Sequence, residues 1–301
     1  MMRRLLPALV LLAALTGCGG TSSDDGKLAV VTAFYPLQFI SERVGGDAVS
    51  VSNLTKAGAE PHDVELNAGQ VGEITEAGLV VYLHGFQPAV DDAVKQNAGD
   101  RAFDAASAVP LLSAGDADEH ADEHSEESGG TDPHIWLDPN RLATIADKLA
   151  ERLGKADPDH AADYTARAAA LHTELTALDG EFSKGLKTCA QREIVTSHTA
   201  FHYLADRYDL EQIGITGIDP EAEPSPQRLA AVAAEAKELG ATTIFFETLV
   251  SPKVAETIAR EVGAQTAVLD PLEGLTDENL DYFTVMRTNL ATLTKALECQ
   301  S

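Results

Sequence analysis

The sequence predicts an α/β protein built as two lobes, each a mostly parallel sheet flanked by helices. Short apolar runs rich in β-branched residues alternate with longer helical patterns from residue 27 onward. Strands that are separated by helices are typical of parallel sheets. A length of 301 residues also exceeds one average domain and is enough for two substantial cores.

The N-terminus has the pattern of a secretory signal. Arg3 and Arg4 precede an apolar run at residues 5–15, which is too short to span a bilayer of roughly 30 Å. Small residues then lead into Cys18, which suits cleavage and lipidation there; the alternative is an ordinary signal peptide with a chance cysteine. We therefore expect a signal peptide at 1–17 and a lipidated tether at 18–26 that anchors the protein to the cell membrane outside the cytoplasm.

The first lobe is predicted at residues 27–157. Three apolar runs predict strands, at residues 28–34, 48–52 and 79–83. A helical pattern at 68–77 precedes the third run. The acidic segment 116–130 has almost no apolar side chains and cannot contribute to a core, so we expect it to form a mobile loop.

Residues 159–186 predict one amphipathic helix of about eight turns. Its apolar positions recur every three or four residues, at Tyr164, Ala168, Leu171, Leu175, Leu178, Phe182 and Leu186. Asp157 and Pro158 supply a start signal, because an N-cap candidate precedes a proline that fits the first turn. The helix either connects two lobes, as segment 158–187, or packs inside one domain.

The second lobe is predicted at residues 188–301. Its apolar runs predict strands at 193–197, 243–246 and 266–269. A helical pattern at 227–239 ends at Gly240, where a left-handed residue commonly terminates a helix. The second half of the chain thus repeats the alternation of the first.

The charge of the chain limits the kinds of ligand that it is expected to bind. With 22 basic and 48 acidic residues the formal net charge is −26, which disfavours nucleic acid and anionic lipid and is compatible with a cation as ligand. Many secreted proteins are acidic for solubility alone, so this indication is weak.

Three cysteines occur in the chain. If Cys18 carries lipid, Cys189 and Cys299 form an even set in an oxidising compartment, which favours a disulfide. Two buried free thiols are the alternative, because sequence does not show whether the two residues come within reach.

Four residues suited to metal binding stand in loops or at the ends of predicted strands. They are His62, His134, His198 and Asp270. Ligands gather beyond the carboxyl ends of parallel strands, so two facing lobes would bring one pair of these residues from each side. Taken singly each histidine is ordinary loop polarity, but the four matching positions together predict a metal site.

These segments resemble the bacterial metal-binding lipoproteins that serve ABC importers for zinc and manganese. The resemblance runs through nearly the whole mature chain and is carried by Pro61-His62-Asp63, residues 133–139 around His134, residues 197–201 around His198, the stretch 217–225, Phe246-Glu247 and Asp270. It implies two α/β lobes joined by one long helix, with a metal in the cleft between them. It implies His62, His134, His198 and Asp270 as ligands, with Glu60 and Glu247 as additional oxygen donors.

The resemblance also implies the metal and the partner. Zinc-type members have histidine at the position of His198 and manganese-type members have glutamate, so we expect one zinc ion, with manganese or another divalent metal as the alternative. The expected partner is the membrane permease of an ABC importer, served by a monomeric carrier that is not an enzyme. A metal-binding surface adhesin is the remaining alternative.

Two histidines, His202 and His84, depart from the family pattern. His202 follows His198 by four residues, without the glutamate of the zincin motif, and is interpreted as a neighbour or a packed helix residue. His84 follows a predicted strand where the family more often has small or amide residues. His120 and His124, in the acidic segment, predict either a weak metal-gathering arm or a plain solvated loop.

Overall fold

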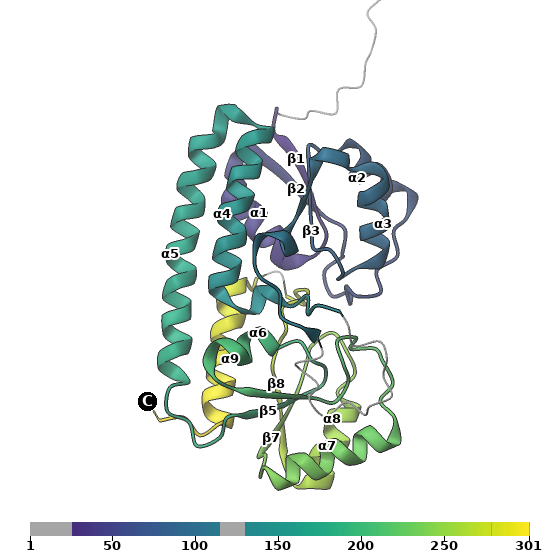
Figure 1. Cartoon of the computed structure of the whole chain (residues 1–301), viewed down its shortest axis with the longest axis vertical. Coiled ribbons are helices and arrows are strands. Elements are labelled where there is room, and N and C mark those ends of the chain that lie inside the picture. The colour runs from purple at the N-terminus through teal and green to yellow at the C-terminus, as the bar shows by residue number, and fades with distance from the viewer. Residues whose placement is uncertain (1–25, 115–129, 278, 301) are drawn as a thin grey trace, which may run out of the picture.

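The computed structural model describes residues 26–114, 130–277 and 279–300 (Figure 1). Cys18, His120 and His124 lie outside the described residues, so the lipidation site and the loop histidines stay predictions.

The first sheet is parallel and has four strands. They are β1 (Leu28–Thr32), β2 (Val49–Asn53), β3 (Leu79–Tyr82) and β4 (Ala102–Asp104), in the order β2-β1-β3-β4. Val30 of β1 lies opposite Val51 on one side and Leu79 on the other. The three strands expected from the apolar runs are therefore present, and β4 is an additional edge strand.

Helices flank this sheet (Figure 1). They are α1 (Tyr35–Gly45), α2 (Ala68–Glu76), α3 (Pro88–Asn97) and α4 (Pro139–Ala156), with short 3₁₀ turns at Gly46–Ala48, Gly99–Arg101, Ala105–Ala108 and Ile135–Leu137. A capping box starts α2, in which Asn67 accepts the Gln70 amide hydrogen and the Gln70 side chain accepts from the Asn67 amide. Asp138 caps α4 through the amide of Asn140.

The second sheet repeats this topology. Its parallel strands β5 (Glu193–Thr196), β6 (Glu211–Gly214), β7 (Thr243–Phe246) and β8 (Gln265–Val268) lie in the order β6-β5-β7-β8. Its helices are α6 (His202–Tyr208), α7 (Pro226–Glu238), α8 (Lys253–Val262) and α9 (Tyr282–Ala296). Gly240 has φ 66°, which confirms the expected left-handed residue after α7. In both sheets the strand order reverses beside the first strand, which is where open sheets collect ligands.

The long helix α5 (Ala161–Gly185) follows a 3₁₀ turn at Pro158–His160 and runs beside both lobes (Figure 1). Its buried residues are Tyr164, Ala168, Leu171, Leu175, Leu178 and Phe182, as the apolar periodicity predicts. Three ion pairs join α5 to helices of both lobes: Glu174 pairs with Arg43 of α1, Asp179 with Arg207 of α6 and Glu181 with Arg287 of α9. The helix therefore joins the lobes, and the alternative of a helix packed inside one domain is set aside.

Two apolar cores stabilise the fold. The larger runs through both lobes, since it contains Val30 of β1 as well as Ile194 of β5, and Phe39 stacks on Tyr282 with ring centroids 5.3 Å apart. The smaller lies between the second sheet and helices α7 and α8, around Val232 and Ile258. The lobes thus meet through a shared core as well as through α5. The boundaries predicted at 157 and 187 stay predictions.

A disulfide joins Cys189, just after α5, to Cys299, just after α9, and confirms the pairing expected from the even cysteine set. Backbone hydrogen bonds accompany it, because the amides of Ala190 and Gln191 donate to the carbonyl oxygen of Leu297. The bond thereby fastens the C-terminal helix to the start of the second lobe. Among the described residues, the structure has no helix with the length and apolar character needed to cross a bilayer.

Replacing Cys189 and Cys299 together by serine is expected to lower the free energy of unfolding. The two residues are 110 positions apart, and closing a loop of about a hundred residues contributes roughly 4.7 kcal/mol in the chain-entropy model. Urea unfolding of the parent and the double variant, both without reductant, measures the difference. The parent unfolded in the presence of reductant is the control and should match the variant; equal midpoints for the oxidised parent and the variant would contradict the prediction.

Candidate metal centre

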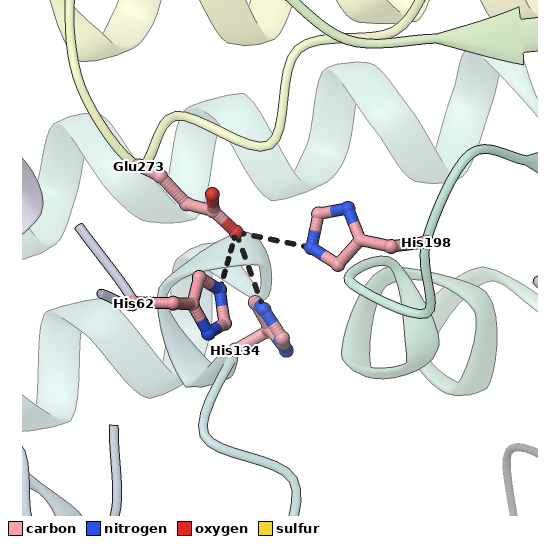
Figure 2. Close-up of side chains that lie close together, drawn as sticks. All are labelled: His62, His134, His198 and Glu273. Carbon is pink, nitrogen blue, oxygen red and sulfur yellow. Dashed lines mark hydrogen bonds and ion pairs between the residues drawn. The ribbon is translucent and has the colours of Figure 1, made fainter. Parts of the chain in front are cut away.

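Four side chains from separate segments of the chain point toward one another (Figure 2). His62 lies in the connection between β2 and α2, and His134 immediately precedes the 3₁₀ turn Ile135–Leu137. His198 follows β5 and Glu273 follows β8. His62, His198 and Glu273 thus lie in loops beyond the carboxyl ends of strands, where parallel sheets collect ligands.

The four side chains form a compact cluster of three nitrogens and one carboxylate oxygen. Glu273 Oε1 lies 3.4 Å from Nε2 of His62, 3.3 Å from Nε2 of His134 and 3.2 Å from Nε2 of His198. One ligand atom from each residue lies within 4.8 Å of all the others. Glu273, His134 and His198 are at most 1% exposed and His62 is 9% exposed.

Buried polar atoms in this cluster indicate that it fits an ion. Glu273 Oε2 and His134 Nε2 are buried and, within the described part of the chain, have no hydrogen-bond partner. Buried polar atoms are normally paired, and unpaired ones need an explanation such as a bound ion. Zinc is commonly bound by histidine nitrogens and by carboxylate oxygens, which are the groups present here.

Carboxylates behind two of the imidazoles orient their rings. His134 Nδ1 lies 2.7 Å from Asp132 Oδ1, and His198 Nδ1 lies 2.7 Å from Glu247 Oε1. A carboxylate at Nδ1 accepts the Nδ1 hydrogen and directs Nε2 toward a metal. Ser197 Oγ donates to the same Glu247 oxygen over 2.6 Å, which fixes that carboxylate in turn.

His62 is held through its backbone and through ring packing. Its amide donates to Glu60 Oε1 over 3.0 Å, and its ring packs edge-on against Phe86 with centroids 4.5 Å apart. The buried side chain of Gln87 donates to the carbonyl oxygen of Pro61 and to Thr55 Oγ1, each over 3.0 Å. The loop is therefore tied to the first lobe directly before His62, at Pro61.

Mutual electrostatics shift the pKa values of the cluster strongly. Burial acts to lower the pKa of His198, but the charges of Glu247 and Glu273 outweigh it and raise that pKa to about 10. Burial likewise opposes the effect of Asp132, which raises the pKa of His134. Burial would raise the pKa of Glu273, yet the charge of His198 and the close approach of all three histidine rings hold it well below its usual value. Without metal, the cluster therefore holds protonated imidazole against carboxylate.

The pKa of the Asp132 carboxylate is also shifted by its neighbours against the effect of burial. Burial would raise the pKa of Asp132, but the charge of His134, the hydrogen bonds from His134 and the nearby His202 ring lower it to about 2. Asp132 is thus an anion that neutralises the His134 imidazole from behind.

The structure brings the three predicted histidines together but replaces Asp270 by Glu273 as their carboxylate neighbour. Asp270 Oδ1 accepts the Leu272 amide hydrogen over 2.8 Å, and Oδ2 accepts from Thr248 Oγ1 over 3.1 Å. Asp270 therefore stabilises the turn after β8, in which Leu272 has φ 59°. That turn aims the side chain of Glu273 at the histidines, which corrects the expectation for Asp270.

The remaining predicted residues lie around the cluster. Glu60 accepts the amide hydrogens of His62 and Asp63, and Glu247 stands behind His198. Neither belongs to the group of four. His202 Nδ1 lies 3.4 Å from Asp132 Oδ2, and the exposed His84 pairs with Asp91.

Comparisons with known proteins agree with this geometry. The model of the family described as zinc-uptake complex component A, periplasmic (ZnuA), matches residues 30–296. The zinc-binding protein AdcA of Streptococcus pyogenes serotype M3 is 38% identical over 287 residues, which cover 89% of this chain and 56% of the relative. The chain thus spans about half the length of such streptococcal relatives.

A relative of similar size and a solved structure extend the comparison. The high-affinity zinc uptake system protein ZnuA of Bacillus subtilis strain 168 is 34% identical over 294 residues, which cover 94% of this chain and 92% of the relative. The crystal structure of Zn(II)-bound AdcA from Streptococcus pneumoniae superposes with a TM-score of 0.77 at 33% identity, over 92% of this chain and 59% of that one. The similarity covers both lobes and all four clustered residues lie inside the matched region.

Proposed function

The chain belongs to the zinc-uptake complex component A family, and from this we propose that it captures zinc outside the cytoplasm and delivers it to an ABC-type importer. The observation that carries the proposal is the buried convergence of three imidazole nitrogens on one carboxylate oxygen. The relatives named as zinc-binding or zinc-uptake proteins support it.

The donor set favours zinc over manganese. Three nitrogens and one oxygen suit the four-coordinate, tetrahedral geometry that zinc adopts, whereas manganese prefers sites rich in oxygen. We propose His62, His134, His198 and Glu273 as the four ligands. A tetrahedral ion held by four protein ligands has no open position for activating water, which favours capture of the ion over catalysis.

The proposed delivery requires a partner and an anchor. The partner is the membrane permease of the importer, which receives the ion from a monomeric carrier. The anchor is lipid on Cys18, a proposal that rests on the signal-like N-terminus because Cys18 lies outside the described residues.

A Cys18→Ala variant is expected to leave the membrane fraction. Acyl chains on the cysteine contribute about 0.8 kcal/mol of membrane binding per buried CH₂, and the soluble lobes carry a net charge that anionic lipid repels. Fractionation after a salt wash, with the parent as control, measures the release. A variant that remains with the membranes would contradict lipid anchoring at this residue.

Competitive metal titration tests the proposed function itself. We expect the purified protein to bind one zinc ion per chain, and manganese to displace it only at a large excess. Elemental analysis of the protein as isolated gives the stoichiometry, and a chromophoric zinc chelator of known affinity gives the strength of binding. A protein that binds no divalent ion, or that binds manganese more tightly than zinc, would overturn the proposal.

A further inference from the structure

His202 stands behind one of the proposed ligands. Its Nδ1 lies 3.4 Å from Asp132 Oδ2, and the other carboxylate oxygen, Oδ1, lies 2.7 Å from His134 Nδ1. The His202 side chain is 16% exposed, whereas Asp132 and His134 are fully buried. The three side chains form a chain, His202–Asp132–His134, that leads from near the surface to the metal centre.

His202 Nδ1 and Asp132 Oδ2 face each other and can form a hydrogen bond. Both His202 Nδ1 and Asp132 Oδ2 are buried and lack a hydrogen-bond partner among the residues that the structure describes. A buried carboxylate oxygen without a donor destabilises the fold, because its lost hydration is not replaced. A separation of 3.4 Å is longer than a good hydrogen bond, so a small rotation of the ring completes the pair.

The next residue of α6 holds the backbone of the same aspartate. Tyr203 Oη donates to the carbonyl oxygen of Asp132 over 2.7 Å and accepts the Leu112 amide hydrogen over 2.9 Å. Consecutive residues at the start of α6 therefore face both the carboxylate and the backbone of Asp132. Since α6 begins four residues after His198, one short segment carries one proposed ligand and supports a second.

We propose that His202 is a positioning residue of the metal centre, which donates its Nδ1 hydrogen to Asp132 and so fixes the carboxylate that orients His134. The inference rests on the proposed zinc-binding function. Without His202 the Asp132 carboxylate lacks a donor at Oδ2 and is held only at Oδ1, by the backbone amide and Nδ1 of His134. The loss would weaken zinc binding although every ligand remains.

A double-mutant cycle on the full chain, read by zinc competition titration, tests this role. Removing partners that orient metal ligands commonly costs 10- to 100-fold in affinity, and we expect about tenfold weaker zinc binding in His202→Ala. Asparagine places an amide nitrogen near the position of Nδ1, so His202→Asn should recover most of the affinity. In an Asp132→Ala background, His202→Ala should cause no further loss, because its effect passes through Asp132.

The control is His172→Ala, which removes an exposed histidine that lies 2.7 Å from Asp147 on the helical surface and should bind zinc like the parent. Melting of the metal-free proteins, measured beside the titration, identifies any variant that does not fold. His202→Ala with parental affinity, or with an equal loss in the presence and absence of the Asp132 side chain, would overturn the inference alone. A parent protein that binds no zinc would overturn the proposed function and this inference with it.

Discussion

Glu273→Gln is expected to weaken zinc binding strongly, whereas Asp270→Asn should leave it close to the parental value. The two substitutions are matched, because each converts a carboxylate near the cluster into its amide, at the buried Glu273 and at the half-buried Asp270. Glu273 Oε1 contacts all three imidazoles, so the amide removes the negative charge of a proposed ligand. Asparagine at position 270 keeps an oxygen that accepts the Leu272 amide hydrogen and so preserves the turn.

The size of the Glu273 effect should exceed that of residues that only orient ligands, for which losses of roughly 10- to 100-fold are usual. Single alanine replacements of His62, His134 and His198 should cause losses of the same class. Competition titration of purified, metal-free variants gives the values. If Asp270→Asn lost affinity and Glu273→Gln retained it, Asp270 would be the ligand in the loaded protein and the site assigned from the metal-free geometry would be wrong.

The sequence did not show which acid, Asp270 or Glu273, lies beside the three histidines. Both acids follow the predicted strand at 266–269, and position after a strand favoured Asp270. Which side chain reaches the histidines depends on the turn, where Asp270 accepts the Leu272 amide hydrogen and Leu272 has a positive φ. The sequence did contain one indication: Glu273 is the only acidic residue in the otherwise uncharged segment 271–275, which is unusual for a surface loop.

The sheets were predictable to the extent that their strands are apolar. Strands at the sheet centres, such as β1 and β7, appear as β-branched or aromatic runs because they are covered on both faces. The missed strands β4 and β6 lie at sheet edges. The three residues of β4 are too short to show a period, and β6 begins with the polar pair Glu211 and Gln212. The long helix was predictable because its apolar stripe persists over seven positions.

The carboxylates behind the histidines were only partly accessible from sequence. Asp132 lies two residues from His134, but nothing in the spacing shows that its side chain turns back to Nδ1. Glu247 was identified as an oxygen donor through the family resemblance, whereas the structure places it against Nδ1 of His198, 49 residues away in the sequence. Pairing of this kind follows from the β5–β7 neighbourhood in the sheet, which the order of elements along the chain does not reveal.

Zinc binding is expected to release at least about one proton per ion at about pH 8, where histidines of ordinary pKa are already neutral. Burial would lower the pKa of His198, but Glu247 and Glu273 raise it to about 10, so the metal-free ring is protonated at that pH. Zinc takes the place of the Nε2 proton that faces Glu273. Affinity should therefore fall about tenfold per pH unit for each proton displaced as pH decreases below about 10, with His134 adding to the slope.

The stability of the metal-free protein should vary with pH in the opposite sense. Because the pKa of His198 is raised in the folded state, its protonated form stabilises the fold fully below the unfolded pKa of about 6.5. That contribution is lost as pH rises toward about 10. The lowered pKa of Glu273 contributes stability that is present above its unfolded value and lost in acid. Zinc-free melting should thus decline above neutral pH while zinc affinity still increases.

Calorimetric titration in two buffers of different ionisation enthalpy counts the released protons directly. Glu247→Gln is the matched variant, because the amide keeps an oxygen to accept from His198 Nδ1 while the negative charge is removed. Without that charge the pKa of His198 should move back toward its ordinary value, and fewer protons should be released at about pH 8. A parent protein that releases no proton at this pH, with an affinity that is flat above about pH 7, would show that the buried imidazoles are neutral before the metal arrives.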